Sequence, residues 1–191
     1  MTATTPGSPT GAQPKCKTQT ANGEETSQNE QPIHIRIEQI IRAAFHAINE
    51  RDFAPTSEPW HSSFSPNFAD DCSGISHDAR VYIAKQYPGD ISDLDIELHV
   101  SKLVTNLQAF LHVEQLLSNA CPEYRYEVGE EMQVSVIRKA KYASVIAHVH
   151  MLGLPPGTRR PSVTLFEFER DADGGWLCVR SKNMPGLHQM D

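Results

Sequence analysis

The C-terminal stretch from residue 141 to residue 183 constrains the fold more than any other part of this sequence. It holds two segments rich in β-branched and aromatic residues, 142–152 and 163–170, separated by the sequence LPPGT at 154–158. The turn sequence DADGG at 171–175 then leads into a third segment, 176–181. This pattern predicts three antiparallel strands joined by turns. One face of such a sheet needs a cover of helices.

Two amphipathic segments upstream can supply that cover. Apolar residues recur at the helical period between Ile37 and Ile48, which predicts a helix from Pro32 or Ile33 to Arg51. The sequence TNLQ at 105–108 has the form of a capping box and predicts a second helix that Pro122 ends. Its core-facing residues are expected to be Leu107, Phe110, Leu111, Val113 and Leu117. His46 and His112 fall on the opposite faces of these helices, so we expect both to be solvated.

The segments between these helices are less regular. Residues 57–68 carry several aromatic residues and predict either a second helix or a loop that caps the core, and these residues could also line a cavity. Residues 70–76 resemble a turn, and 77–93 could be strand or helix in an insertion near the mouth of a pocket. Residues 94–100 alternate between apolar and polar, which predicts a half-buried strand. Residues 124–137 should begin the main sheet, with a hairpin turn at 138–141.

Composition sets the expected organisation of the chain. Residues 1–31 are polar with almost nothing apolar, so we expect a disordered tail, and the absence of arginine there argues against a transit peptide. Residues 32–185 should form one α+β domain, followed by a short tail at 186–191. The net charge of −7 argues against nucleic acid or an anionic membrane as a partner. Four widely spaced cysteines, with no apolar run long enough to span a membrane, favour a cytoplasmic protein with free thiols.

Three stretches carry a resemblance to a known family. They are AAFHAINERDF at 43–53, ACPEYRYEV at 120–128 and LFEFERDADGGW at 165–176. Together with the order of elements they resemble the NTF2-like superfamily, and within it the SnoaL-like group of polyketide cyclases and isomerases. The resemblance implies a cone-shaped α+β barrel, in which a curved antiparallel sheet wraps around helices and encloses a pocket. It also implies a homodimer formed through the sheet.

The resemblance does not carry over a catalytic acid. SnoaL-like cyclases resemble one another in an acidic residue near the end of the last strand, whereas this chain reads CVRSKN at 178–183, without a carboxylate. Arg180 is expected to point outward, because Leu177 and Val179 form the more apolar face of that strand. The sequence contains no readable Ser-His-Asp or Cys-His arrangement, phosphate-binding glycine loop or dinucleotide fingerprint.

His148 and His150 are the candidate catalytic residues, because they lie two apart on a predicted strand and leave it on the same face. If that face lines the pocket, the two imidazoles could act as general acid and base near neutral pH. Alternatively, the face is a dimer interface or is exposed to solvent, with Val145, Ala147 and Val149 inside. A metal site would need a third ligand from 95–99, and LPP at 154–156 replaces the glutamate of a cupin-type site, so no metal is expected.

The predicted strand at 163–170 supplies candidates for binding. Small residues lie near one end of its inner face and aromatic residues near the other, which suits a pocket for a flat, hydrophobic molecule, although core packing explains the aromatic residues as well. With the aromatic residues of 57–68, the predicted substrate-binding residues are Trp60, Phe64, Thr164, Phe166 and Phe168.

Two functions remain open on the sequence. The first is a cofactor-free isomerase, cyclase or lyase, such as a dehydratase, that acts by proton transfer on a hydrophobic polyketide- or terpenoid-like intermediate. The alternative is a non-catalytic NTF2-like module for binding or dimerisation. In either case we expect a hydrophobic small molecule as ligand, a homodimer and no cofactor.

Overall fold

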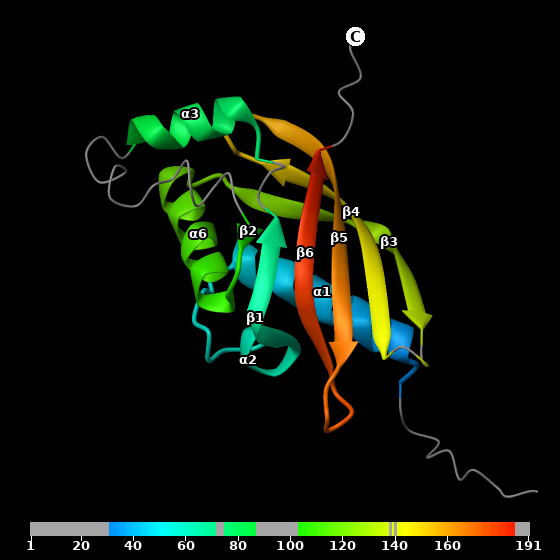
Figure 1. The fold of residues 1–191 in the computed structure, drawn as a ribbon. Helices are drawn as coiled ribbons and strands as arrows, with labels where there is room; N and C mark the ends of the chain where they lie inside the picture. Colours follow the sequence, from blue (N-terminus) through cyan, green and yellow to red (C-terminus); the bar gives the residue numbers. More distant parts are fainter. Residues whose placement is uncertain (1–30, 72–74, 87–102, 138, 140, 186–191) are drawn as a thin grey trace, which may run out of the picture. The chain divides into compact units, whose positions relative to one another are not determined.

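The computed structural model (Figure 1) describes residues 31–71, 75–86, 103–137, 139 and 141–185. These residues form four helices and six strands, all within one compact unit that begins at Gln31. The helices are α1 (Ile33–Asn49), α2 (Trp60–Ser63), α3 (His77–Gln86) and α6 (Leu107–Ala120). The strands are β1 (Phe64–Asp71), β2 (Leu103–Val104), β3 (Arg125–Ile137), β4 (Tyr142–Leu152), β5 (Arg159–Arg170) and β6 (Trp176–Pro185).

All six strands belong to one sheet in the order β2-β1-β6-β5-β4-β3. Strands β3 to β6 form an antiparallel meander, which confirms the four strands expected from the sequence. Strand β5 begins four residues earlier than expected, because Arg159 pairs with Leu152. Strand β6 continues to Pro185, which pairs with Ser162. The long middle strands therefore give the sheet enough length to bend around helices, as Figure 1 shows.

Helix α1 is tied to the edge strand β3 by side-chain hydrogen bonds. Asn49 Nδ2 donates to the Tyr126 carbonyl oxygen at 2.9 Å, and the Tyr126 amide donates to Asn49 Oδ1 at 2.8 Å. Arg42 donates to the carbonyl oxygens of Gly129 and Glu130, where β3 bulges away from β4. These bonds satisfy edge backbone groups that would otherwise be open to another strand. They also hold Tyr126 in place against the helix.

Helix α6 begins and ends as the sequence pattern predicts, within one residue. The N-cap is Asn106, whose Oδ1 accepts from the Ala109 amide at 2.8 Å, instead of Thr105. All five expected core residues of the helix are buried. At its C-terminal end, Arg51 donates to Ser118 Oγ and, at 2.9 Å, to the Pro122 carbonyl oxygen. The segment after α1 is thereby joined to the last turn of α6.

Strand β1 is the main error of the sequence-based expectation. We expected a helix or loop at 57–68 and a turn at 70–76, whereas only Trp60–Ser63 is helical and Phe64–Asp71 is a strand. Phe64 and Phe68 lie an even number of residues apart and are both buried, but Pro66 and Asn67 have low β propensity and hide the pattern. The strand forms because β6 supplies a parallel partner, with Ala69 opposite Arg180.

Helix α3 answers, for residues 77–86, the question that the sequence left open at 77–93, and residues 87–93 lie outside the described residues. Residues 77–86 are helical, with Ala79 and Ile83 buried. The strand expected at 94–100 lies outside the described residues, as do the expected tail at 186–191 and, except for Gln31, the expected tail at 1–31. In the described part of the chain, no helix is long and apolar enough to cross a membrane.

Candidate functional site

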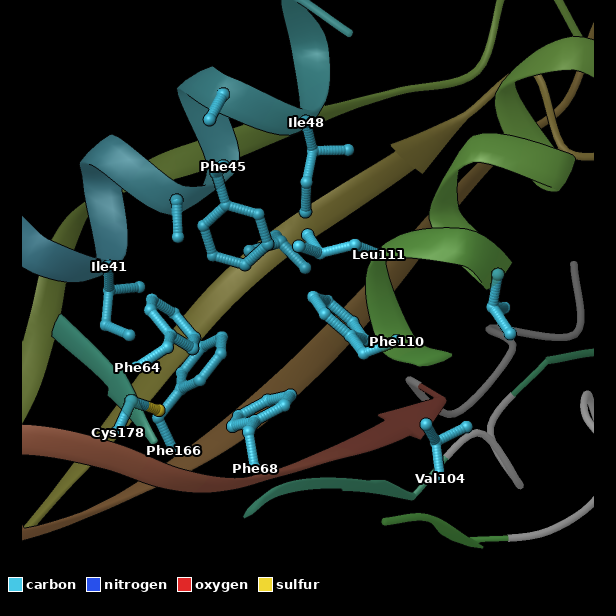
Figure 2. Close-up of a cluster of buried hydrophobic side chains, with 14 of the residues drawn as sticks. Ile41, Phe45, Ile48, Phe64, Phe68, Val104, Phe110, Leu111, Phe166 and Cys178 are labelled. Carbon is cyan, nitrogen blue, oxygen red and sulfur yellow. The ribbon is translucent and has the colours of Figure 1, made fainter. Parts of the chain in front are cut away.

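A small cavity lies between the inner face of the sheet and the helices α1 and α6 (Figure 2). Its volume is about 50 Å³, which is room for roughly three water molecules. Most of the lining is apolar or aromatic, and a minority is polar. The aromatic lining residues are Phe45, Trp60, Phe64, Phe68, Phe110, Tyr124, Tyr126 and Phe166, and the polar side chains are Asp70, Glu114, Thr164, Ser181 and Asn183.

The aromatic wall is held by edge-to-face contacts. Phe45 of α1 meets Phe166 of β5 with ring centroids 5.7 Å apart and planes at 82°. Phe68 of β1 meets Phe110 of α6 at 5.1 Å. Trp60 is fully buried, and its Nε1 donates to the Asp52 carbonyl oxygen at 2.8 Å. Because this bond satisfies the polar atom of the indole, the ring can pack among apolar neighbours.

Glu114 is the main ionisable group of the cavity. It lies on the buried face of α6, between Phe110 and Leu117 in the helical repeat. Its Oε2 accepts a hydrogen bond from Tyr124 Oη at 3.0 Å. Burial raises the pKa of Glu114 to about 8, more than the bond from Tyr124 lowers it, and the charge of Asp70 raises it further. At neutral pH Glu114 is therefore mostly a neutral carboxylic acid that can donate a proton.

Tyr124 links Glu114 to Tyr126, because its hydroxyl lies 2.6 Å from Tyr126 Oη. Burial, followed by the charge of Glu114, raises the pKa of Tyr124 well above its ordinary value. A hydroxyl has one hydrogen, so Tyr124 can donate to only one of its two neighbours at a time. When Glu114 is ionised, Tyr124 donates to it; when Glu114 is neutral, its own proton can point to Tyr124, which then donates to Tyr126. The direction of the hydrogen bonds that connect Glu114, Tyr124 and Tyr126 therefore depends on the protonation state of Glu114.

Asp70 presents the second carboxylate to the cavity. It is half-buried near the end of β1, directly opposite Ser181 of β6, and Ser181 Oγ donates to Asp70 Oδ1. Glu114 and Asp70 thus reach the same cavity from a helix and a strand. Two carboxyl groups in such different surroundings are suited to different roles, one as acid and the other as base.

Four of the five predicted binding residues line this cavity: Trp60, Phe64, Thr164 and Phe166. Their role in binding a substrate remains a prediction. Phe168 lies on the same face of β5 and is fully buried, but it packs in the core and is not part of the lining. Its distance from the cavity follows from its place at the far end of the strand, opposite Cys178 and Ala143.

The structure places His148 and His150 on the other face of the sheet. Strand β4 alternates between buried and accessible residues, with Val145, Ala147 and Val149 facing the core. His148 is exposed and His150 is half-buried, and neither belongs to the described lining of the cavity. The alternative orientation considered from the sequence is therefore the one observed. A catalytic role for the two histidines required that their face of the strand line the pocket, and the structure places that face on the other side of the sheet.

The expected orientations of three other polar residues, Arg180, His46 and His112, agree with the structure. Arg180 points outward, where its Nε lies 3.7 Å from Glu167 Oε2. His46 and His112 are exposed. No cluster of three or more histidine, cysteine, aspartate or glutamate side chains suited to a metal occurs within the described ranges. Residues 95–99, which could have supplied a third ligand to the histidines, lie outside those ranges.

The sequence analysis missed Glu114, Asp70 and the tyrosine pair. Glu114 could have been found, because it lies four residues after Phe110 and three before Leu117, on the apolar stripe of the helix. A carboxylate on such a stripe is rarely buried unless it is paired, so this position marks a candidate site. Asp70 gave no comparable signal, because it ends a strand that the sequence did not reveal.

Comparison with known proteins supports the fold at the level of structure alone. No protein-family model matches the sequence, and no curated protein sequence is significantly similar to it. A proposed dehydratase of the NTF2-like family from Streptomyces avermitilis is 16% identical, with a TM-score of 0.50 over 81% of this chain and 96% of that one. The CaMKII hub of S. rosetta is 12% identical, with a TM-score of 0.52 over 82% and 99%.

A third similar structure is a protein of unknown function with a cystatin-like fold from Nostoc punctiforme, which is 6% identical with a TM-score of 0.52 over 81% of this chain and 91% of that one. The fold is therefore NTF2-like, an α+β arrangement of a curved, mostly antiparallel sheet and helices, as the sequence resemblance implied. At these identities the likeness extends to the fold and not to an activity.

Proposed function

We propose that the cavity binds an apolar small molecule and that Glu114 and Asp70 transfer a proton on it without a cofactor. One observation carries this proposal: Glu114 is a buried carboxylic acid, with a pKa of about 8, that shares an aromatic cavity with a second carboxylate. The reaction class is that of an isomerase, cyclase or lyase. Aromatic walls suit a polyketide- or terpenoid-like skeleton.

The two carboxyl groups divide the proton transfer between them. Asp70 takes a proton from a carbon next to a carbonyl group, and the C–H electron pair forms the C=C bond of an enol. At the same time the carbonyl oxygen takes the proton of Glu114, so that no free charge develops on oxygen. In a substrate with a neighbouring C=C bond the product is a dienol. Asp70 then returns its proton to the carbon at the far end of the dienol, while Glu114 takes back the proton of the enol oxygen, which completes an isomerisation. Tyr124 and Tyr126 follow the change at Glu114 by reversing their hydrogen bonds.

The size of the cavity limits how a ligand can enter. A volume of about 50 Å³ is well below the ~300–1,000 Å³ of a typical small-molecule site. A ligand with a carbon skeleton therefore requires the aromatic side chains to move apart. The edge-to-face contacts of Phe45, Phe68 and Phe110 allow this movement, since each ring is held by other rings and not by polar bonds.

Hydrogen exchange at carbon tests the proposal directly. In D2O, we expect the protein to accelerate deuterium incorporation next to the carbonyl of cyclic ketones with and without a ring nitrogen, such as N-methyl-4-piperidone and 4-methylcyclohexanone. Glu114→Gln and Asp70→Asn should each remove about a hundredfold of the acceleration, whereas the exposed Glu50→Gln should change nothing. If neither ketone exchanges faster with protein than in buffer, catalysis of this kind is excluded, and the non-catalytic binding module becomes the better proposal.

The outer face of the sheet supports a second proposal, a homodimer. Ile146 pairs with Leu165, and the neighbouring Val163 pairs with Met184, so apolar side chains of β4, β5 and β6 lie together on the accessible side. Met184 is 37% exposed. His148 lies beside this patch, opposite Val163. A second copy of the chain would cover the patch, which is the dimer that the family resemblance implies.

Sedimentation analysis tests the dimer. We expect the protein to sediment as a dimer and Leu165→Glu, which places a charge in the centre of the patch, to sediment as a monomer with unchanged far-UV circular dichroism. Glu169→Gln, at an exposed position of the same strand, is the matched control. A monomeric wild-type protein at high concentration would contradict the proposal.

A further inference from the structure

One buried hydroxyl group beside the cavity has no hydrogen-bond partner in the described part of the chain. Buried glutamate, serine and threonine side chains occur there at five positions, and four of them are bonded to another side chain. These four are Glu114 with Tyr124, Ser118 with Arg51, Ser162 with Asn183 and Ser181 with Asp70. The fifth is Thr164, which is only 6% exposed, and no described residue forms a hydrogen bond with its hydroxyl group.

The hydroxyl group of Thr164 is open to the cavity. Every side-chain nitrogen or oxygen that is fully enclosed among the described residues has a hydrogen-bond partner. Thr164 Oγ1 has none, so it is not fully enclosed, and the space that Thr164 lines is the cavity. A hydroxyl group that an apolar ligand covers loses its hydrogen bonds to water. A ligand that fills the cavity is therefore favoured when it offers Thr164 a partner.

Asn183 lies beside Thr164 in the wall of the cavity. The two residues are directly opposite each other where β5 pairs with β6, and both line the cavity. The Cβ atoms of such a pair are ~5 Å apart, so one ligand atom can contact both side chains. Ser162 bonds to Asn183 Oδ1 and thereby holds the amide group. An amide has a second polar atom, which remains for a ligand.

The cavity thus has hydrogen-bonding groups on two walls. Thr164 and Asn183 belong to the sheet, whereas Glu114 reaches the cavity from α6. Aromatic and aliphatic side chains supply most of the remaining lining, and Figure 2 shows rings from both the helices and the sheet. A ligand that satisfies both polar walls needs two oxygen atoms on an apolar skeleton.

We propose that Thr164 binds a second oxygen atom of the substrate, which is an apolar ketone that also carries a hydroxyl or carbonyl group. This inference rests on the proposed function of the cavity, and it adds the class of the substrate and the residue that selects it. The hydroxyl group of Thr164 can donate to a carbonyl oxygen or accept from a hydroxyl group. A substrate bound at both walls has its reacting carbonyl group held toward Glu114.

The second oxygen belongs to an uncharged group. Thr164 carries no charge, and Glu114, with a pKa of about 8, is mostly neutral at pH 7. Two charged residues lie close by: Asp70 lines the cavity, and Arg80 Nε donates to the carbonyl oxygen of the lining residue Ile75 at 3.1 Å. A hydrogen bond between Thr164 and a neutral oxygen requires neither of these charges, since both of its partners are neutral.

Two ketones of nearly the same shape test the proposal. In 4-hydroxycyclohexanone a hydroxyl group lies opposite the carbonyl group, and in 4-methylcyclohexanone a methyl group takes its place. Any widening of the cavity is similar for both, so the ratio of their affinities reports the second oxygen. We expect the wild-type protein to bind the hydroxyketone about tenfold more tightly. Titration calorimetry or NMR of the Met151 methyl group, which lines the cavity, measures both affinities.

Three variants locate this preference. Thr164→Val replaces the hydroxyl group by a methyl group of similar size, so the ratio of the two affinities should fall about tenfold, whereas the melting temperature should not fall. Thr164→Ser retains the hydroxyl group and should retain the preference for the hydroxyketone. Thr105→Val, at an exposed position, is the matched control and should leave the ratio unchanged.

Four results overturn the proposal. The first is a wild-type protein that binds 4-methylcyclohexanone as tightly as the hydroxyketone. The second is a ratio of affinities that is the same in the wild-type protein and in Thr164→Val. The third is a loss of the preference in Thr164→Ser, which would assign the effect to packing of the threonine methyl group. The fourth is that neither ketone binds at millimolar concentration.

Deuterium exchange distinguishes failure of this proposal from failure of the proposed function. Exchange of 4-methylcyclohexanone by the wild-type protein tests proton transfer without a second oxygen. If that exchange is accelerated while the ratio of affinities is independent of Thr164, proton transfer stands and the role of Thr164 fails. If neither ketone exchanges faster than in buffer while the ratio depends on Thr164, proton transfer fails, and the cavity binds the oxygenated ligand without catalysis.

Discussion

Glu114 and His148 illustrate how the two faces of this sheet differ. Each is an ionisable residue between apolar neighbours on a regular element, Glu114 on α6 and His148 on β4. In water the histidine is the better proton carrier near pH 7 and the glutamate is fully ionised. In the folded chain Glu114 is buried beside the cavity with a pKa of about 8, whereas His148 is exposed. Burial, and not the residue type, determines which group is suited to acid catalysis.

The inner and outer faces are separated by a single residue along each strand. In β4 the buried residues Val145, Ala147 and Val149 alternate with Ile146 and His148. A shift of one residue in register would bring the histidines to the cavity and place the small apolar residues in solvent. Burial of these apolar residues therefore fixes the orientation of the histidines. The following predictions test this contrast between the faces, beginning with the largest effect.

Removal of an inner-face ring should have the largest effect. Phe168 is fully buried at the inner face of β5. Phe168→Ala should lower the free energy of unfolding by about 3–5 kcal/mol, from lost burial and the cavity left behind. Leu165→Ala, three residues earlier on the outer face and only half-buried, should cost clearly less when measured below the concentration at which copies associate. Equal losses in urea-induced unfolding would mean that the two faces are equally buried in solution.

Glu114 should make stability depend on pH. Its pKa rises from about 4.5 in the unfolded chain to about 8 in the folded one. Between these values the folded state keeps a proton that the unfolded state has lost, so stability decreases as pH rises from 4.5 to 8. The total decrease in the free energy of unfolding that this change in pKa produces is roughly a few kcal/mol. Solvent screens the effect little, because the side chain is almost completely buried. Urea-induced unfolding at pH 5 and at pH 8 measures the decrease.

Glu114→Gln isolates the contribution of this residue. The amide cannot ionise. The difference in the free energy of unfolding between the wild-type protein and the variant should therefore change between pH 4.5 and pH 8 and be constant above pH 8. Glu50→Gln, at an exposed position, should leave the pH dependence as it is. An unchanged pH dependence in Glu114→Gln would show that Glu114 is already ionised at neutral pH, and would remove the acid from the proposed site.

The sequence predicted the meander and both long helices because their signals are local. Strands β4 and β5 are rich in β-branched and aromatic residues, and α1 and α6 have clear apolar stripes. Strand β1 was missed because its evidence is not local: Phe64 and Phe68 are stabilised by a parallel partner more than a hundred residues away, β6. Propensity alone does not report such a partner.

The sequence predicted the apolar residues of the candidate site and missed its ionisable residues. Thr164 and Phe166 could be named because small and large residues on one face of a predicted strand suggest a wall, and Trp60 and Phe64 because aromatic residues gather at 57–68. The acid groups could not be paired from the sequence, since Asp70 and Glu114 come together only when β1 packs against α6. The histidine pair attracted the prediction because a spacing of two fixes a common face, but it does not fix which face.

Loss of the link between α1 and β3 should have an intermediate effect. Asn49 exchanges two hydrogen bonds with the backbone of Tyr126, at 2.9 and 2.8 Å. Asn49→Ala leaves that amide and carbonyl without their partner and should lower the free energy of unfolding by about 1–3 kcal/mol. It should also weaken binding of a cavity ligand, because Tyr126 lines the cavity. His46→Ala, on the exposed side of the same helix, is the control. If both variants lose the same stability and the same ligand affinity, Asn49 does not position Tyr126.

The smallest effect is expected at the histidines on which a sequence-based mechanism would depend. His148 is exposed and His150 is half-buried on the outer face, so neither forms part of the core. His148→Gln and His150→Gln should each change the free energy of unfolding by less than about 0.5 kcal/mol. Because the body of the sheet separates them from Glu114 and Asp70, both variants should exchange ketone protons as the wild-type protein does.

The same variants also distinguish the two faces in the assembled protein. His148 lies beside the apolar patch formed by Ile146, Leu165 and Met184, so His148→Gln is expected to change the dimer dissociation constant measured by sedimentation. Glu114→Gln is expected to leave that constant unchanged, since its side chain is buried on the opposite side of the sheet. A loss of ketone exchange in His148→Gln, with stability intact, would contradict this separation, because it would require the outer face to take part in the chemistry of the inner one.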